Sequence, residues 1–391
     1  MKWQKLTINE LCEIKGGKRL PKNHELIEQE TNHPYIRARD IGNGIIDFNK
    51  PVYLQESTFN FISRYIVKAN DIVLTIVGAN IGDVGLIPKH LDGANLTENA
   101  VKLTSFNDNC HFKYLLYYFL LPGKKKQLEQ VAAGSAQGKL GLYKIKDIEV
   151  SIPPLPTQRK IASILSGYDD LIENNLKRIK LLEEAINISY RNIISYDKEY
   201  TIVKLNSFVD IISGYPFKSS YYNENGKHKI VTIKNVQDGF FVPIVTDRID
   251  DIPDNMNKAL FLSTSDIIMS LTGNVGRVCL VYGDDYVLNQ RVVKLSAMEQ
   301  IDQSFIYAFV RDKQTLTILE NLSNGTAQQN LSPIKMGELH IKYPNLNLRE
   351  DFNKKVSPMV EMICKLNIQN TKVREARDIL LPRLMNGEIE V

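Results

Sequence analysis

The sequence predicts an α+β protein in which two similar mixed α/β domains are joined by two long antiparallel coiled-coil helices. Segments of the first half recur in the second half in the same order, offset by about 190 residues, which indicates duplicated structural units. Each half ends in a turn containing proline and then in a long segment with a heptad pattern of apolar residues. At 391 residues, 43% of them hydrophobic, the chain is long enough for both domains to bury cores.

The repeated unit consists of extended segments, hairpins and short helices. Each copy opens with an amphipathic segment that ends in glycine, at Gly17 and Gly214. There follow, in matching order, YIRARDIGNGIID and IVTIKNVQDGFFV, the hairpins DIVLTIVGANIGDVGLIP and DIIMSLTGNVGRVCLVY, then ENAVKL and QRVVKL, the aromatic helices YLLYYFLL and FIYAFV, and the GSAQ and GTAQ segments. Strand-turn-strand patterns recur by chance in α+β proteins, but this conserved order favours duplication.

Both heptad segments place apolar residues in alternating steps of four and three. The first seam is Ile161, Leu165, Tyr168, Ile172, Asn175, Ile179, Leu182, Ile186, Ser189 and Ile193; the second is Phe352, Val356, Met359, Ile363, Leu366, Asn370, Val373, Arg377, Leu380 and Leu384. The alternative is that each helix packs separately on its own domain. Asn175 and Asn370 become opposite neighbours only if the helices run antiparallel, and a buried amide without a partner costs roughly 1–3 kcal/mol, so we predict an antiparallel pair.

These patterns divide the chain into a first domain at 1–154, a first spacer helix at 155–200, a second domain at 201–345 and a second spacer helix at 346–391. The first seam is about 48 Å long at 1.5 Å per residue, somewhat more than one turn of duplex DNA at about 34–36 Å. Pro358 lies early in the second helix and is expected to kink it or to delay its start, because proline lacks the backbone donor.

Composition and charge alone do not identify the class of protein. Lys and Arg outnumber Asp and Glu by 49 to 45, so any basic surface must be local. The four cysteines have no metal-ligand spacing, and we interpret them as reduced thiols. The N-terminal segment lacks the pattern of a signal peptide and no stretch of about 18 apolar residues occurs, which predicts a cytoplasmic protein with no membrane partner.

The chain resembles the specificity subunits of type I restriction-modification systems along essentially its whole length. The residues that carry the resemblance are SIPPLPTQRKIASIL (151–165), ILLPRLMNGEIEV (379–391), GSAQ and GTAQ, and the hairpins GANIGDVGLIP and TGNVGRVCLVY. One departure is the second linker, KYPNLNLREDF, which lacks the proline-rich form of the first. The resemblance implies two target-recognition domains, each followed by a spacer helix.

The resemblance also implies partners and a division of labour. The chain would read an asymmetric bipartite site in double-stranded DNA, one half per domain, and would scaffold two modification (methyltransferase) subunits, with two restriction (translocase and endonuclease) subunits joining the assembly. S-adenosylmethionine would belong to the modification subunits, and ATP and Mg²⁺ to the restriction subunits. No cofactor, metal or catalytic residue is expected in this chain.

Candidate DNA contacts are cationic and amide side chains in the turns of each copy, since such donors reach phosphates and base edges. The GSAQ and GTAQ segments are the leading candidates, because glycine allows close backbone approach beside a hydroxyl and an amide. Arg37 and Arg39 are expected to share one face of a strand. The full set is Lys18, Arg19, Lys22, Arg37, Arg39, Ser135, Gln137, Lys139, Lys144, Lys218, Lys234, Asn274, Arg277, Arg291, Thr326, Gln328, Gln329 and Lys335. The triple-lysine run at 124–126 is a further candidate for phosphate contact.

Two rival classes of protein remain open: an enzyme, either a methyltransferase or a nuclease, and a scaffold that does not bind DNA. An adenine methyltransferase would show a Gly-rich cofactor loop and a catalytic tetrapeptide in which two prolines precede an aromatic residue, but Pro154 is followed by leucine. A nuclease would show clustered carboxylates with a lysine on adjacent strands, and neither Asp169-Asp170 nor Asp284-Asp285 lies in such a pattern. A coiled-coil scaffold that never binds DNA would share the helices and the duplication, but it gives no reason for basic and amide loops in both copies.

Overall fold

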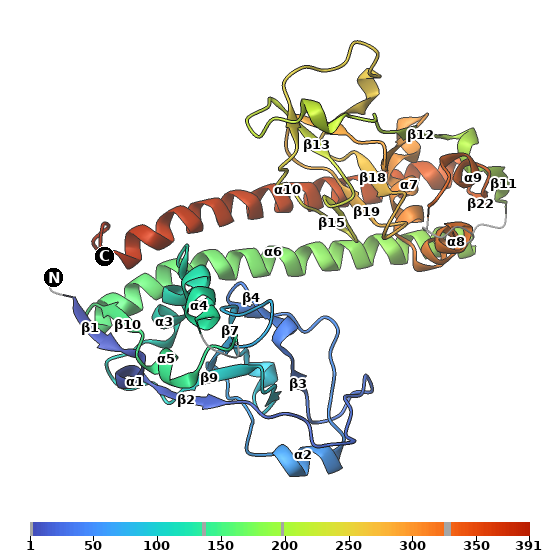
Figure 1. The fold of residues 1–391 in the computed structure, drawn as a ribbon. Helices are drawn as coiled ribbons and strands as arrows, with labels where there is room; N and C mark the ends of the chain where they lie inside the picture. Colours follow the sequence, from blue (N-terminus) through green and yellow to red (C-terminus); the bar gives the residue numbers. More distant parts are fainter. Residues whose placement is uncertain (1–2, 135–137, 197–198, 324–329) are drawn as a thin grey trace. The chain divides into compact units, whose positions relative to one another are not determined.

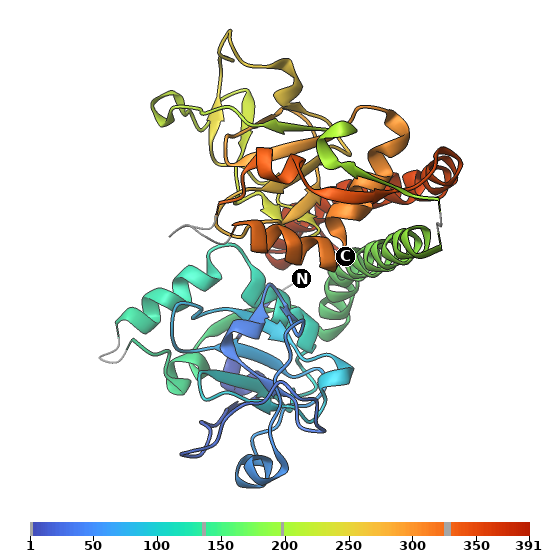
Figure 2. The same cartoon turned by 90° about the vertical axis from the view of Figure 1, so that its right-hand side faces the viewer.

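A computed structural model describes residues 3–134, 138–196, 199–323 and 330–391, and the chain divides into two compact units (Figure 1 and Figure 2). Unit 1 comprises Met1–Asp170 and Arg374–Val391, and unit 2 comprises Leu171–Val373. Two long helices, α6 (Leu155–Tyr196) and α10 (Leu346–Met385), contribute residues to both units. Each unit otherwise contains one copy of the repeat.

The first copy is organised around a four-stranded antiparallel sheet with strand order β2-β9-β6-β7. Helix α3 packs on β7 and on α4 (Figure 1). The elements are β1 (Gln4–Thr7), α1 (Ile8–Leu11), β2 (Glu13–Gly16), β3 (Tyr35–Ile36), η1 (Ala38–Asp40), β4 (Ile41–Gly42), β5 (Ile45–Ile46), α2 (Glu56–Ile62), β6 (Ile72–Thr75), β7 (Val84–Leu86), η2 (Lys89–Leu91), β8 (Asn95–Leu96), β9 (Ala100–Thr104), α3 (Phe112–Leu120), α4 (Lys124–Ala133), α5 (Leu142–Lys146) and β10 (Glu149–Ile152).

The second copy repeats this plan, and its sheet has the order β12-β21-β18-β19. A second four-stranded sheet, β16-β13-β20-β17, lies in the same unit. The elements are β11 (Thr201–Lys204), η3 (Leu205–Ser207), β12 (Val209–Ser213), η4 (Ser219–Tyr221), β13 (His228–Val231), β14 (Val236–Gln237), β15 (Phe240–Phe241), β16 (Arg248–Ile249), η5 (Lys258–Leu260), β17 (Phe261–Leu262), β18 (Ile267–Ser270), β19 (Val278–Leu280), β20 (Tyr286–Leu288), β21 (Val292–Ala297), η6 (Gln300–Asp302), α7 (Gln303–Arg311), α8 (Lys313–Ser323), α9 (Pro333–Gly337) and β22 (His340–Tyr343).

The inner strand β6 begins with three apolar residues in a row because it lies between two cores. Ile72 and Leu74 pack in the cluster beneath α3, whereas Val73 faces a second cluster with Ile36 and Leu96. Successive side chains of a strand point to opposite faces, so a strand buried on both faces needs a continuous apolar run. Strand β18 repeats this division.

The heptad seams are largely buried, and the helices pack antiparallel within each unit. In unit 2, Asn175 Nδ2 donates to Asn370 Oδ1 at 2.9 Å, which is the contact that the antiparallel register predicts. In unit 1, Ile161 shares a core with Leu384, close to the start of α6 and the end of α10.

The expectation for Pro358 was wrong where it concerned a delayed start of the helix. Helix α10 begins at Leu346 and continues past Pro358. Seam residues on either side, Val356 and Ile363, are almost fully buried. Their packing outweighs the local penalty of about 3 kcal/mol for proline in a helix interior, because tertiary burial supplies most of a helix's stability.

Each copy meets the helix that follows it through one polar side chain at an equivalent position, but the chemistry differs. Gln158 accepts a hydrogen bond from the backbone N–H of His111 at 2.8 Å and donates to the Pro153 carbonyl at 2.8 Å. In the second copy, Arg349 Nη1 pairs with Asp302 Oδ1 at 2.5 Å, and Arg349 Nε donates to the Pro344 carbonyl at 3.1 Å. We call this contact between a copy and the start of its long helix the joint. The second linker keeps the joint and replaces a neutral amide with a buried ion pair.

Candidate nucleic-acid interface

In the first copy, backbone hydrogen bonds bring four segments that are distant in sequence into one ladder. Lys18 N donates to the Leu96 carbonyl at 3.0 Å, and Ile76 N donates to the Asn99 carbonyl at 2.8 Å. Leu140 N then donates to the Ile76 carbonyl at 3.0 Å. The order across the ladder is therefore 17–19, 96–99, 76–77 and 139–140.

The second copy builds the same ladder at equivalent positions. Tyr215 N donates to the Leu288 carbonyl at 2.8 Å, Leu271 N to the Arg291 carbonyl at 3.0 Å, and Leu331 N to the Leu271 carbonyl at 2.9 Å. Its segments are 214–218, 288–291, 271–274 and 330–331. We call each ladder the four-segment edge of its copy.

Glycine is required where the first segment enters each edge. A Cβ atom on Gly17 would lie 2.0 Å from the Thr97 carbonyl oxygen, and one on Gly214 would lie 2.1 Å from the Asn289 carbonyl oxygen. Both contacts are with backbone, which cannot move aside. The glycine at the end of each amphipathic segment thus serves this close approach.

A glycine-rich loop leaves each edge and rests on a helix, but the two loops carry opposite charges. In the first copy, Asp83 pairs with Lys125 of α4 at 2.7 Å. In the second copy the equivalent position is Arg277, and the helix residue equivalent to Lys125 is Leu316 of α8. Arg277 turns instead to Gln237 of β14, with Nη1 2.5 Å from the Gln237 Oε1 atom.

The β14–β15 hairpin that carries Gln237 is anchored by Arg311. This guanidinium pairs with Asp238 in the turn and, at 3.3 Å, with Glu183 of α6. Burial acts to lower the pKa of Arg311, but the nearby Glu183 and Asp238 carboxylates raise it above its ordinary value, so the group stays charged. A Cβ atom on Gly239 would lie 2.7 Å from Arg311 Nη2, and the residue has φ +71°, so glycine is needed here.

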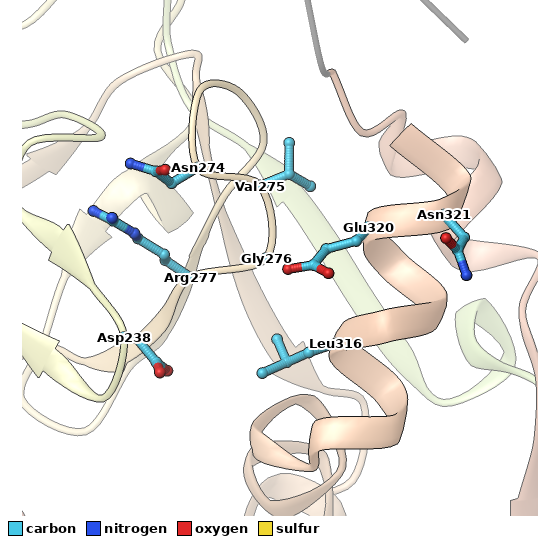
Figure 3. A pocket seen from close by; sticks show the side chains of 8 residues that line it. All are labelled: Asp238, Asn274, Val275, Gly276, Arg277, Leu316, Glu320 and Asn321. Atoms are coloured by element: carbon cyan, nitrogen blue, oxygen red, sulfur yellow. The ribbon is translucent and has the colours of Figure 1, made fainter. Parts of the chain in front are cut away.

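A cavity of about 460 Å³ lies between the second loop and α8 (Figure 3). Figure 3 shows Asn274 and Arg277 extending from the loop, with Leu316 and Glu320 reaching from α8 toward it. Asp238 lines the same cavity.

The structure brings several of the predicted DNA contacts together and leaves others apart. Lys18 and Arg19 are exposed on or beside the first edge, where Lys139 is half-buried; Arg291 and Asn274 are exposed on the second edge, with Lys218 beside them. Lys22 and Arg39 are exposed in loops of the first copy, and Lys234 in a loop of the second. Gln237 Nε2 donates to the Lys234 carbonyl at 3.0 Å, which places Lys234 near Arg277.

The prediction that Arg37 and Arg39 share a strand face was wrong. Strand β3 ends at Ile36, and Arg37 precedes the 3₁₀ turn η1. The Arg37 guanidinium is held by the buried Asp40 at 2.8 Å and donates to the Lys50 carbonyl at 2.7 Å. Arg37 therefore stabilises its own loop.

Other predicted contacts lie away from the edges or outside the described residues. Lys144 in α5 donates to the Val131 carbonyl at 2.7 Å, and Lys335 is exposed in α9. In the triple-lysine run, Lys124 donates to Tyr118 Oη at 3.0 Å and Lys125 is paired as above. Ser135, Gln137, Thr326, Gln328 and Gln329 are outside the described residues.

Sequence reasoning did not identify Gln237 and Ser270, which support the second loop, or Asp83. The signal for Asp83 was available, since the aligned repeats place a carboxylate opposite a guanidinium at Arg277. Within the ranges that the structure describes, no group of His, Cys, Asp or Glu is placed to hold a metal ion. No described helix is both long and apolar enough to cross a membrane.

Two copies of one α+β domain, each with a similar edge and each followed by a long helix, define a class of proteins that present two related surfaces. The family model for the type I restriction modification DNA specificity domain matches residues 1–184 and 197–358, and the chain belongs to this family. It is thus a specificity subunit, the non-catalytic class of subunit in such systems.

Individual relatives agree with this assignment. The chain is 26% identical to the type I restriction enzyme MjaVIII specificity subunit of Methanocaldococcus jannaschii, covering 100% of this chain and 93% of the relative. It is 24% identical to the MjaIX specificity subunit of the same organism, covering 100% and 94%. The crystal structure of the type I restriction-modification S subunit from M. genitalium has the same fold, with a TM-score of 0.61 at 17% identity, covering 98% of this chain and 96% of that one.

Proposed function

We propose that this specificity subunit reads an asymmetric bipartite site in double-stranded DNA, with one half read by each copy. The observation that carries the proposal is the four-segment edge, which has the same backbone in both copies and different side chains. In the loop that leaves each edge, Asp83 of the first copy corresponds to Arg277 of the second. Because base choice depends on the donors and acceptors presented, one scaffold with unlike side chains reads two unlike half-sites.

We further propose that the chain scaffolds two modification subunits, with two restriction subunits joining the full assembly. In support, α6 exposes large apolar side chains in unit 2: Leu181 is 64% exposed and Ile188 is 61% exposed. Exposed apolar residues on a helix are suited to a protein partner. S-adenosylmethionine would belong to the modification subunits, and ATP and Mg²⁺ to the restriction subunits.

The test is selection from randomised duplexes, using this chain co-purified with its modification subunits at moderate salt. We expect two unlike short blocks separated by a fixed unread gap. A single palindrome, or no enriched sequence from an intact complex, would refute DNA reading by two copies and favour a scaffold that does not bind DNA. Repeating the binding at several salt concentrations measures the phosphate contribution, since phosphate contacts make affinity fall steeply with salt.

A further inference from the structure

Arg277 is held in place by neighbours in its own copy. Its Nη1 donates to Gln237, as described above, and with the Asn274 amide oxygen turned toward it, Nη2 lies 2.9 Å and Nη1 3.2 Å from that oxygen. The loop is closed by Ser270, whose hydroxyl donates to the Asn274 carbonyl at 2.5 Å and accepts from Arg277 N at 3.2 Å. The guanidinium is therefore positioned before any ligand arrives.

One edge of this guanidinium is left over for a ligand. Gln237 accepts from Nη1, and the Asn274 amide oxygen accepts from Nη2 and Nη1, so two of the five N–H donors are left: that of Nε and the second one of Nη2. Among the residues that the structure describes, none accepts a hydrogen bond from Nε, and the second N–H of Nη2 lies beside it. Two parallel donors on one edge match the O6 and N7 acceptors of guanine, the commonest specific contact of arginine in the major groove.

The surroundings favour a base edge over a phosphate. The cavity beside Arg277 is lined by the carboxylates of Glu320 and Asp238 (Figure 3). Asp238 is paired with Arg311, but like charges repel, so the Glu320 carboxylate disfavours a phosphate in that space. A guanine edge carries no net charge and also presents two acceptors to the two free donors of the guanidinium.

We propose that Arg277 reads a guanine in the half-site bound by the second copy, with Gln237 and Asn274 as positioning residues. This proposal rests on the proposed function above. The first copy does not offer the same contact, because its equivalent residue is Asp83, which is paired with Lys125. The guanine contact therefore belongs to one half of the site only.

The first test repeats the duplex selection with Arg277→Lys and, as a comparison, Arg291→Ala in the full complex. Lysine keeps the charge but cannot form the two-pronged contact. We expect Arg277→Lys to relax one guanine position in one block by about 5- to 150-fold and to leave the other block unchanged. Arg291 is exposed on the edge, and its substitution should weaken all sequences to a similar degree.

A second test changes the DNA. Replacing that guanine with 7-deazaguanine removes N7 and keeps base pairing, so wild-type binding should weaken while Arg277→Ala should be insensitive to the replacement. Gln237→Leu should partly relax the same position without changing the salt dependence.

The outcomes separate the two proposals. If the wild type selects no two-block motif, the proposed function fails and this inference fails with it. If the motif is present but the second block lacks guanine, or Arg277→Lys leaves it unchanged or weakens all sequences equally, only the role of Arg277 is overturned.

Discussion

The joint between the second copy and α10 depends on a buried ion pair, and the substitution Asp302→Asn should weaken it severely. Asp302 is fully buried, accepts from Tyr343 Oη at 2.7 Å and faces Arg349 at 2.5 Å. Asparagine keeps the shape and leaves Arg349, whose side chain is only 9% exposed, without a counter-charge. Removing one partner of a buried pair costs about 3–5 kcal/mol.

In a folding unit of about 200 residues, such a loss lowers the melting temperature by about 6–20 °C. Differential scanning calorimetry of the full chain measures this shift. Asp351→Asn is the matched control, because Asp351 also lies in unit 2 but pairs with Lys354 at 3.8 Å with both side chains exposed, so its loss should have almost no effect. The double substitution Asp302→Asn with Arg349→Gln imitates the neutral joint at Gln158 and should recover most of the stability. A shift below about 2 °C for Asp302→Asn alone would refute the reasoning.

Three further predictions concern the helices and the cores. Asn175→Leu should destabilise unit 2 by about 1–3 kcal/mol because it leaves the buried Asn370 amide with an apolar neighbour. The double variant with leucine at both positions should regain the lost stability. Equal unfolding midpoints for the single variant and the wild type would contradict this prediction. Burial raises the pKa of Tyr307 and Tyr343 above the ordinary value of 10, so the folded state holds more protons above pH 10. Stability should be fully present below that pH and fall as pH rises further. Exposed tyrosines ionise in the folded state, and the phenolate absorbance of these two tyrosines should be added only with unfolding. Burial also raises the pKa of the Cys12 thiol to about 12, so a thiol reagent at pH 8 should label it only after denaturation, and rapid labelling of the native chain would contradict the packing.

The repeat and the helices could be predicted because their signals are local. Heptad spacing identified the seams, and the two asparagines set the register because an unpaired buried amide is unfavourable. The predicted delay of the helix at Pro358 was wrong because it rested on local propensity alone. The packing of Val356 and Ile363 on either side stabilises the helix there.

The candidate site was harder to predict because its pairings join distant segments. Spacing does not reveal that the turn after Gly17 lies beside Leu96, since that ladder depends on a backbone contact across the whole domain. Nor does it show which cations are already paired: Arg37 looked like a free donor, and only its contact with Asp40 shows otherwise. Arg277 and Arg291 were chosen as candidates because their loops recur in the aligned copies.

In the proposed function, the two copies each read one half of a DNA site. The most direct measurement is the affinity of the complex for four duplexes that carry both selected blocks, the first only, the second only, or neither. We predict that each block contributes to binding and that the two losses in binding free energy add, because well-separated positions act independently. Unchanged affinity after one block is scrambled would show that the corresponding copy does not read DNA.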